Sequence, residues 1–111
     1  MLKREDAGPV TILTQREEDL LADCASLHET CSGLVEQGRT QIVLDMEDVG
    51  CVTSVYLGAL ISIVRLLREH DGTLKMLHLQ PAVSSFMEMS RLSRIIEIFN
   101  DRDAALKSFS D

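Results

Sequence analysis

One group of residues carries the side-chain types of a metal site. Cys24, His28 and Cys31 recur at helical spacing, so their side chains can point to similar sides of one helix. The spacing matches no known zinc signature, and both cysteines coincide with the apolar face of that helix. We therefore expect buried thiols rather than a metal site. Cys51 precedes a predicted helix and is expected to be packed or inert.

Acidic side chains follow a short apolar run in the middle of the chain. Asp45, Glu47 and Asp48 have the ligand atoms of a metal site or of an acid pair, but a solvated loop after a strand is the favoured interpretation. His70 and His78 have no partner at the spacing of a catalytic triad. The sequence contains neither a glycine-rich phosphate loop nor a nucleophile elbow. It therefore predicts no catalytic residue, no metal and no cofactor.

Ser54 stands at the start of a helical pattern, where its hydroxyl can act in two ways. A serine there usually accepts a hydrogen bond from an N–H group of the first turn, so helix capping is the favoured role, with Thr53 as the other candidate cap. A phosphate on Ser54 would add about two negative charges beside the positive end of the helix dipole, which the fold would tolerate. An interface that accepts a hydroxyl would then lose affinity.

The helix after Ser54 has two apolar stripes. The stripe expected to face the sheet consists of Leu57, Leu60, Ile61, Val64 and Leu67. The second stripe consists of Tyr56, Ala59, Ile63 and Leu66. Either neighbouring helices shield this second stripe, which is favoured, or a partner or a second copy of the chain covers it.

Composition sets the class of protein. A chain of 111 residues with 45% hydrophobic content is expected to form one folded domain. The formal net charge of -7 argues against nucleic acid as a partner. No apolar run approaches the roughly 20 residues that cross a bilayer, and no signal-peptide core follows the N-terminus. With three cysteines that form no disulfide framework, these features predict a cytoplasmic protein without membrane insertion.

Strands and helices alternate along the chain. Residues 1–8 are polar and charged and end at Gly8-Pro9, which predicts a flexible tail before a domain over residues 9–111. Strands are predicted over residues 10–13, 20–21, 41–45, 73–79 and 94–99, and helices over residues 23–37, 54–70, 81–89 and from a cap at Asn100 or Asp101 to Phe109. Gly72 is expected to end the second helix in the left-handed conformation. The order predicts an α/β fold with a mostly parallel sheet whose central strand is residues 41–45.

Three segments together resemble the STAS domain family of sulfate transporters and anti-sigma factor antagonists. The segment Ile42 to Gly58 (IVLDMEDVGCVTSVYLG) resembles its buried strand ending in Leu-Asp, its short loop and its Asp-Ser-Ser/Thr-Gly-Leu-Gly turn. Residues 71–83 (DGTLKMLHLQPAV) are similar to the next strand and helix start, and residues 90–99 to the following helix-to-strand passage. Thr53 stands where the family usually has Asp, and Tyr56 where it has Gly. The resemblance implies a single domain with a small mixed, mostly parallel sheet and about four helices packed on it.

The resemblance also implies a function for the turn. In anti-sigma factor antagonists the first serine of the turn is phosphorylated by the partner kinase, and Ser54 matches it. The implied protein is a non-enzymatic partner switch in transcription regulation, which binds an anti-sigma factor or related protein kinase and which a protein phosphatase resets. The expected partner-binding residues are Thr53, Val55, Tyr56, Gly58, Ala59 and Ile63. The missing Asp and the bulk of Tyr56 favour an alternative: a STAS scaffold, or an interaction subunit of a transporter or signalling complex, that is not phosphorylated.

Overall fold

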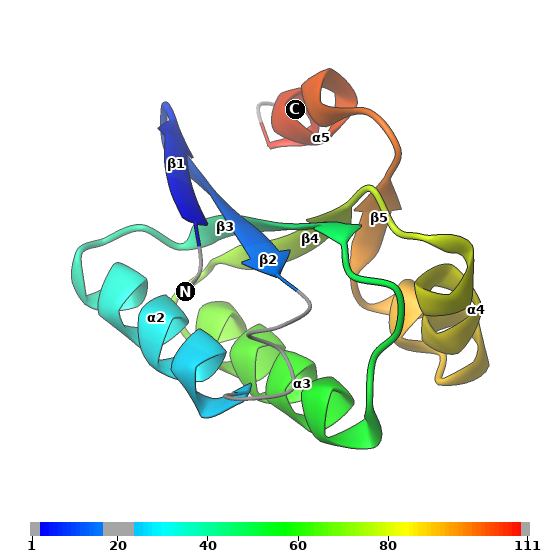
Figure 1. Cartoon of the computed structure of the whole chain (residues 1–111). Coiled ribbons are helices and arrows are strands. Elements are labelled where there is room, and N and C mark those ends of the chain that lie inside the picture. The colour runs from blue at the N-terminus through cyan, green and yellow to red at the C-terminus, as the bar shows by residue number, and fades with distance from the viewer. Residues whose placement is uncertain (1–2, 17–23, 110–111) are drawn as a thin grey trace.

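The structure, a computed structural model, describes residues 3–16 and 24–109. The strand predicted at residues 20–21 lies outside the described residues. Strands and helices alternate after an N-terminal pair of strands (Figure 1). The strands are β1 (Lys3–Ala7), β2 (Val10–Arg16), β3 (Gln41–Asp48), β4 (Thr73–Leu77) and β5 (Glu97–Phe99), and the helices are α2 (Cys24–Glu36), α3 (Ser54–Arg68), α4 (Pro81–Met89), a short 3-10 helix (Leu92–Arg94) and α5 (Arg102–Ser108).

The five strands form one mixed sheet in the order β1-β2-β3-β4-β5. The pairs β2-β3, β3-β4 and β4-β5 are parallel, whereas β1-β2 is antiparallel. Ile42, Val43 and Leu44 of β3 are fully buried, as expected for a strand covered on both faces. The predicted α/β fold, with a mostly parallel sheet and the strand from Gln41 at its centre, is confirmed.

Strand β1 differs from the flexible tail predicted over residues 1–8. Lys3–Ala7 pairs with β2, with Ala7 opposite Val10 across a two-residue turn. Gly8 has a φ of 62° at the first position of this turn, where glycine adopts a positive φ at little cost. The charged residues that predict a tail also suit an exposed edge strand. Glu5 additionally forms an ion pair with Arg102 of α5.

The helices cover both faces of the sheet. Figure 1 shows α2 and α3 side by side below the sheet and α5 above it. The larger core joins β3 and β4 to α2, α3 and α4, and a smaller one packs Ala105 of α5 on Val43 and Leu77.

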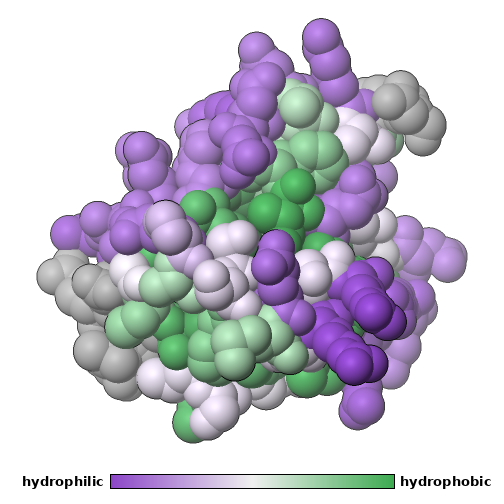
Figure 2. All heavy atoms as spheres, turned by 90° about the vertical axis from the view of Figure 1, so that its right-hand side faces the viewer, coloured by the Kyte–Doolittle hydropathy of each residue, from purple (hydrophilic) through white to green (hydrophobic). Residues whose placement is uncertain are grey.

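On the α4 side of the molecule, apolar side chains gather in the middle and lower part of the surface, with hydrophilic side chains above them (Figure 2). No helix in the described part of the chain has the length and apolar character needed to span a membrane.

The end of β4 and the start of β5 differ from prediction for local reasons. Strand β4 ends at Leu77 rather than at residue 79, because His78 has a φ of 57° and leaves the extended conformation. The strand predicted from residue 94 begins at Glu97, after the 3-10 turn. Asp101 caps α5 by accepting a hydrogen bond from the N–H of Asp103 at 3.2 Å, which decides between the two predicted caps.

Gly72 follows the end of α3 but does not adopt the left-handed conformation predicted for it. Asp71, with a φ of 57°, holds the left-handed position, and the N–H of Gly72 donates to the carbonyl of Leu67 at 2.7 Å. Gly72 is instead required by close packing, because a Cβ there would lie 2.7 Å from the Cβ of Thr40. The N–H of Thr73 holds this approach by donating to the carbonyl of Thr40 at 2.9 Å.

We expect Gly72→Ala to lower the free energy of unfolding by about 1–3 kcal/mol, because the added methyl group forces the Thr40 backbone to move. Urea denaturation measures the change. Gly33→Ala is the matched control, since a Cβ at Gly33 in α2 has no neighbour within 4 Å. A Gly72→Ala protein as stable as the wild type would contradict the packing argument.

Candidate functional site at the start of helix α3

The candidate site begins where the chain leaves the central strand and enters α3. Residues 49–53 connect β3 to α3, and Val49 is buried while Cys51 and Thr53 are exposed. The Oγ1 of Thr53 accepts a hydrogen bond from the N–H of Tyr56 at 3.3 Å, and its backbone has extended angles typical of an N-cap. The favoured prediction that Ser54 caps the helix is therefore wrong. Thr53, one position earlier, accepts the hydrogen bond of an N–H group in the first turn.

Because Thr53 caps α3, the hydroxyl of Ser54 is not needed for capping. Ser54 is the first residue of α3 and is exposed, and its hydroxyl makes no hydrogen bond to the described part of the chain. The first turn of α3 contains no acidic residue, whereas Arg65 and Arg68 lie in the last turn. The positive end of the helix dipole therefore faces Ser54 without a compensating charge.

Two of the predicted partner-binding residues are buried. Tyr56 is 1% exposed and Ile63 is 0% exposed, so neither side chain can contact a partner. The hydroxyl of Tyr56 donates toward Oε1 of Gln15 at 3.4 Å and toward Sδ of Met46 at 3.5 Å. The prediction that Tyr56 and Ile63 bind a partner is wrong, because α3 turns both inward to the core. The bulk of Tyr56 consequently does not obstruct Ser54.

The surface around Ser54 is instead made by residues on the outer face of α3. Val55 is 68% exposed, Gly58 is exposed and Ala59 is half-buried. Ile61, predicted to face the sheet, is 38% exposed and belongs to this surface. We call the set Ser54, Val55, Gly58, Ile61 and Arg65 the outer face of α3; positions 54, 58, 61 and 65 follow helical spacing on one side.

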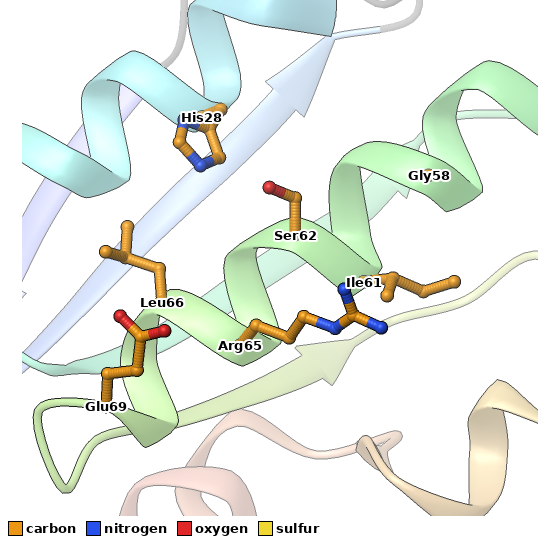
Figure 3. A pocket seen from close by; sticks show the side chains of 7 residues that line it. All are labelled: His28, Gly58, Ile61, Ser62, Arg65, Leu66 and Glu69. Atoms are coloured by element: carbon orange, nitrogen blue, oxygen red, sulfur yellow. The ribbon is translucent and has the colours of Figure 1, made fainter.

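A groove continues this outer face toward the C-terminal end of α3. It has a volume of about 340 Å³ and is lined by His28, Gly58, Ile61, Ser62, Arg65, Leu66 and Glu69. Figure 3 shows His28 extending from α2 toward Ser62, while Arg65 reaches along α3 toward Ile61. None of the ion pairs among the described residues involves Arg65. The outer face thus combines exposed apolar side chains with a guanidinium group that a partner can pair.

Among the described side chains, Cys31, Cys51 and His28 form no cluster of metal ligands. The side chain of Cys24 lies outside what the structure describes, and His28 faces the groove. Burial raises the pKa of the Cys31 thiol to about 12, which disfavours the thiolate that metals bind. Cys51 is exposed rather than packed.

A cluster of two carboxylates and an imidazole forms in place of the predicted solvated loop. Asp45 and Glu47 belong to β3, and His78, which follows β4, lies next to both. Sequence spacing gave no sign of this, because 33 residues separate Asp45 from His78. The parallel register that puts Asp45 opposite Leu77 brings them together. The predicted strands over residues 41–45 and 73–79 were the available signal, because as parallel neighbours they bring Asp45 and His78 to the same edge of the sheet.

The comparison with protein families decides the identity of the fold. A family model described as Mlab, STAS domain matches residues 7–97, which include the whole of the candidate site. The chain belongs to the STAS domain family. This STAS domain is also 27% identical over 88 residues to BtrV of Bordetella bronchiseptica, a candidate anti-sigma factor antagonist, with 79% of this chain and 76% of BtrV covered.

Solved structures show the same fold in this STAS domain. The tm1081 protein of Thermotoga maritima, a candidate anti-sigma factor antagonist, superposes with a TM-score of 0.88 at 17% identity, over 99% of this chain and 95% of that one. The anti-sigma factor antagonist SpoIIAA in its unphosphorylated form has a TM-score of 0.81 at 18% identity, over 100% and 98%. Phosphorylated SpoIIAA from Bacillus has a TM-score of 0.74 at 15% identity, over 98% and 99%.

Proposed function

We propose that this STAS domain is an anti-sigma factor antagonist that binds an anti-sigma factor or a related protein kinase and is released when Ser54 is phosphorylated. The observation that carries the proposal is that different residues cap α3 and offer a free hydroxyl at its start. Thr53 caps the helix, so the exposed hydroxyl of Ser54 is available to a kinase. Modification of Ser54 removes no hydrogen bond to the rest of the described fold.

The electrostatics of α3 favour a phosphate at Ser54. A phosphoserine carries about two negative charges and three acceptor oxygens. At the first position of α3 these charges meet the N-terminal N–H groups, in a turn without acidic residues. The fold therefore tolerates the phosphorylated state, and the effect of the phosphate falls on the partner instead.

The outer face of α3 supplies the contact with the partner. Val55 and Ile61 are two exposed apolar side chains on one helix, and Gly58 between them lets another backbone approach closely. Thr53 and Ala59 complete this surface. A phosphate in the middle of such an interface has to be desolvated, so the partner dissociates. A protein phosphatase then restores the binding-competent form.

The relatives support this proposal. BtrV and the tm1081 protein are candidate anti-sigma factor antagonists, and SpoIIAA, an established one, exists in unphosphorylated and phosphorylated forms. The role is regulatory rather than catalytic. We place it in the cytoplasm, where ATP and protein kinases meet.

The test is to incubate the wild-type protein with ATP and an extract of its own cells and to map phosphate by mass spectrometry. We expect phosphate on Ser54 and none at this position in Ser54→Ala, while circular dichroism of the two proteins is the same. Phosphorylation that avoids Ser54, or none at all, contradicts the switch.

The second candidate function is a scaffold that binds its complex constitutively. Thr53, which stands where the family usually has Asp, favours it, since no carboxylate precedes Ser54. A partner complex that forms equally well with wild type and with Ser54→Asp would establish this alternative in place of the switch.

A further inference from the structure

Three side chains able to bind a metal ion meet at the carboxyl ends of β3 and β4. One ligand atom from each of Asp45, Glu47 and His78 lies within 4.8 Å of the other two. The Nδ1 of His78 is 3.2 Å from Oδ1 of Asp45 and 3.9 Å from Oε2 of Glu47. Ligand atoms about 2.1 Å from a shared ion are themselves about 3–4 Å apart, so these separations suit a common ion after small side-chain adjustments.

The two carboxylates give this cluster a negative charge that a bound cation would neutralise. Asp45 and Glu47 form no ion pair with a lysine or arginine of the described residues; their partner is the imidazole of His78. The side chain of Asp45 is 18% exposed, so water only partly compensates its charge. A divalent ion would neutralise the two carboxylates together.

Hydrogen bonds already hold the carboxylate of Asp45 and the backbones of Glu47 and His78. The N–H of Glu47 donates to Oδ1 of Asp45 at 3.1 Å, and Nε2 of Gln80 donates to the carbonyl of Glu47 at 2.7 Å. The N–H of His78 donates to the carbonyl of Phe99 at 3.0 Å, which fixes the backbone that carries the imidazole. Such second-layer contacts reduce the reorganisation that metal binding requires.

The donor set indicates the class of metal. Mg²⁺ and Ca²⁺ prefer oxygen ligands alone, whereas an imidazole nitrogen with two carboxylate oxygens suits Zn²⁺, Mn²⁺, Co²⁺ or Fe²⁺. We propose that Asp45, Glu47 and His78 bind one divalent transition-metal ion, whose remaining positions are open to water. The ion would join the end of β3 to the segment between β4 and α4. This proposal does not depend on phosphorylation of Ser54.

Calorimetric titration of the chelator-treated full chain with Zn²⁺ tests the proposal. We expect one equivalent to bind, and His78→Asn and Glu47→Gln each to weaken binding by at least about 10-fold. Asparagine tolerates the positive φ of position 78, and Glu47 is exposed, so both variants keep the fold. Visible absorption of bound Co²⁺ is expected to lose intensity in His78→Asn, which reports directly on the imidazole ligand.

His70→Asn is the matched control, because His70 is exposed at the end of α3 and outside the cluster. It is expected to bind Zn²⁺ like the wild type. Equal Zn²⁺ affinity of wild type, His78→Asn and Glu47→Gln overturns the proposal, as does equal affinity of the wild type for Mg²⁺ and Zn²⁺.

Discussion

Ser54→Asp is expected to weaken binding to the anti-sigma partner by about 100-fold, which corresponds to about 2.8 kcal/mol. Ser54 is exposed and lies beside Val55 and Gly58, so a partner that covers this face must also cover residue 54. A carboxylate at that position has to be desolvated in an interface that accepts a hydroxyl, which costs affinity. Isothermal titration calorimetry with the purified partner measures the change.

Two controls separate charge from general disturbance of the surface. Ser54→Ala is expected to bind within about threefold of the wild type and to unfold within about 0.5 kcal/mol of it, since Thr53 caps the helix. Ser85→Asp places the same charge on an exposed serine of α4 and is expected to leave binding unchanged. Equal losses in Ser54→Asp and Ser85→Asp would show that net charge, not the position of Ser54, governs the affinity.

Tyr56→Ala is expected to lower the free energy of unfolding by about 3–5 kcal/mol. Tyr56 is among the largest fully buried side chains and packs in the core that joins β3 to α2, α3 and α4. Its removal leaves a cavity at the first turn of α3 and frees Oε1 of the buried Gln15 from its hydroxyl partner. Urea denaturation followed by circular dichroism gives the value.

Tyr56→Phe distinguishes packing from hydrogen bonding at the same position. It keeps the ring and removes the hydroxyl, with its contacts to Gln15 and Met46, so we expect a cost of about 0.5–1.5 kcal/mol. If Tyr56→Ala costs no more than Tyr56→Phe, the ring is not part of the core, and Tyr56 returns as a candidate for the surface.

The order of the elements was predictable because it depends on local patterns. The run Ile42-Val43-Leu44 between polar segments predicts a buried strand, and Pro81 at the first turn of α4 predicts a helix start. β1 was missed because an exposed edge strand needs no apolar alternation. The expected tail and the observed strand have the same composition.

The orientation of α3 could not be predicted, because apolar residues occur nearly all round it. Two apolar stripes could each face the sheet by their helical spacing. One contains Leu57 and Ile61, and the other contains Tyr56 and Ile63. Contact with the sheet and with α2 selects Tyr56 and Ile63 for the core and leaves Ile61 at the surface. The position of Ser54 at the start of α3 was predicted correctly from sequence. Its freedom from capping was not, because serine is the more frequent N-cap by type and Thr53 nevertheless holds that position.

The most direct measurement of the Ser54 switch follows the purified complex of this STAS domain with its kinase partner after ATP is added. Size-exclusion chromatography and intact mass are read from the same samples. We predict that the wild-type protein gains one phosphate and leaves the complex, whereas Ser54→Ala gains none and stays bound. Release of Ser54→Ala at the wild-type rate, or a wild-type protein phosphorylated on Ser54 that remains bound, would contradict the switch.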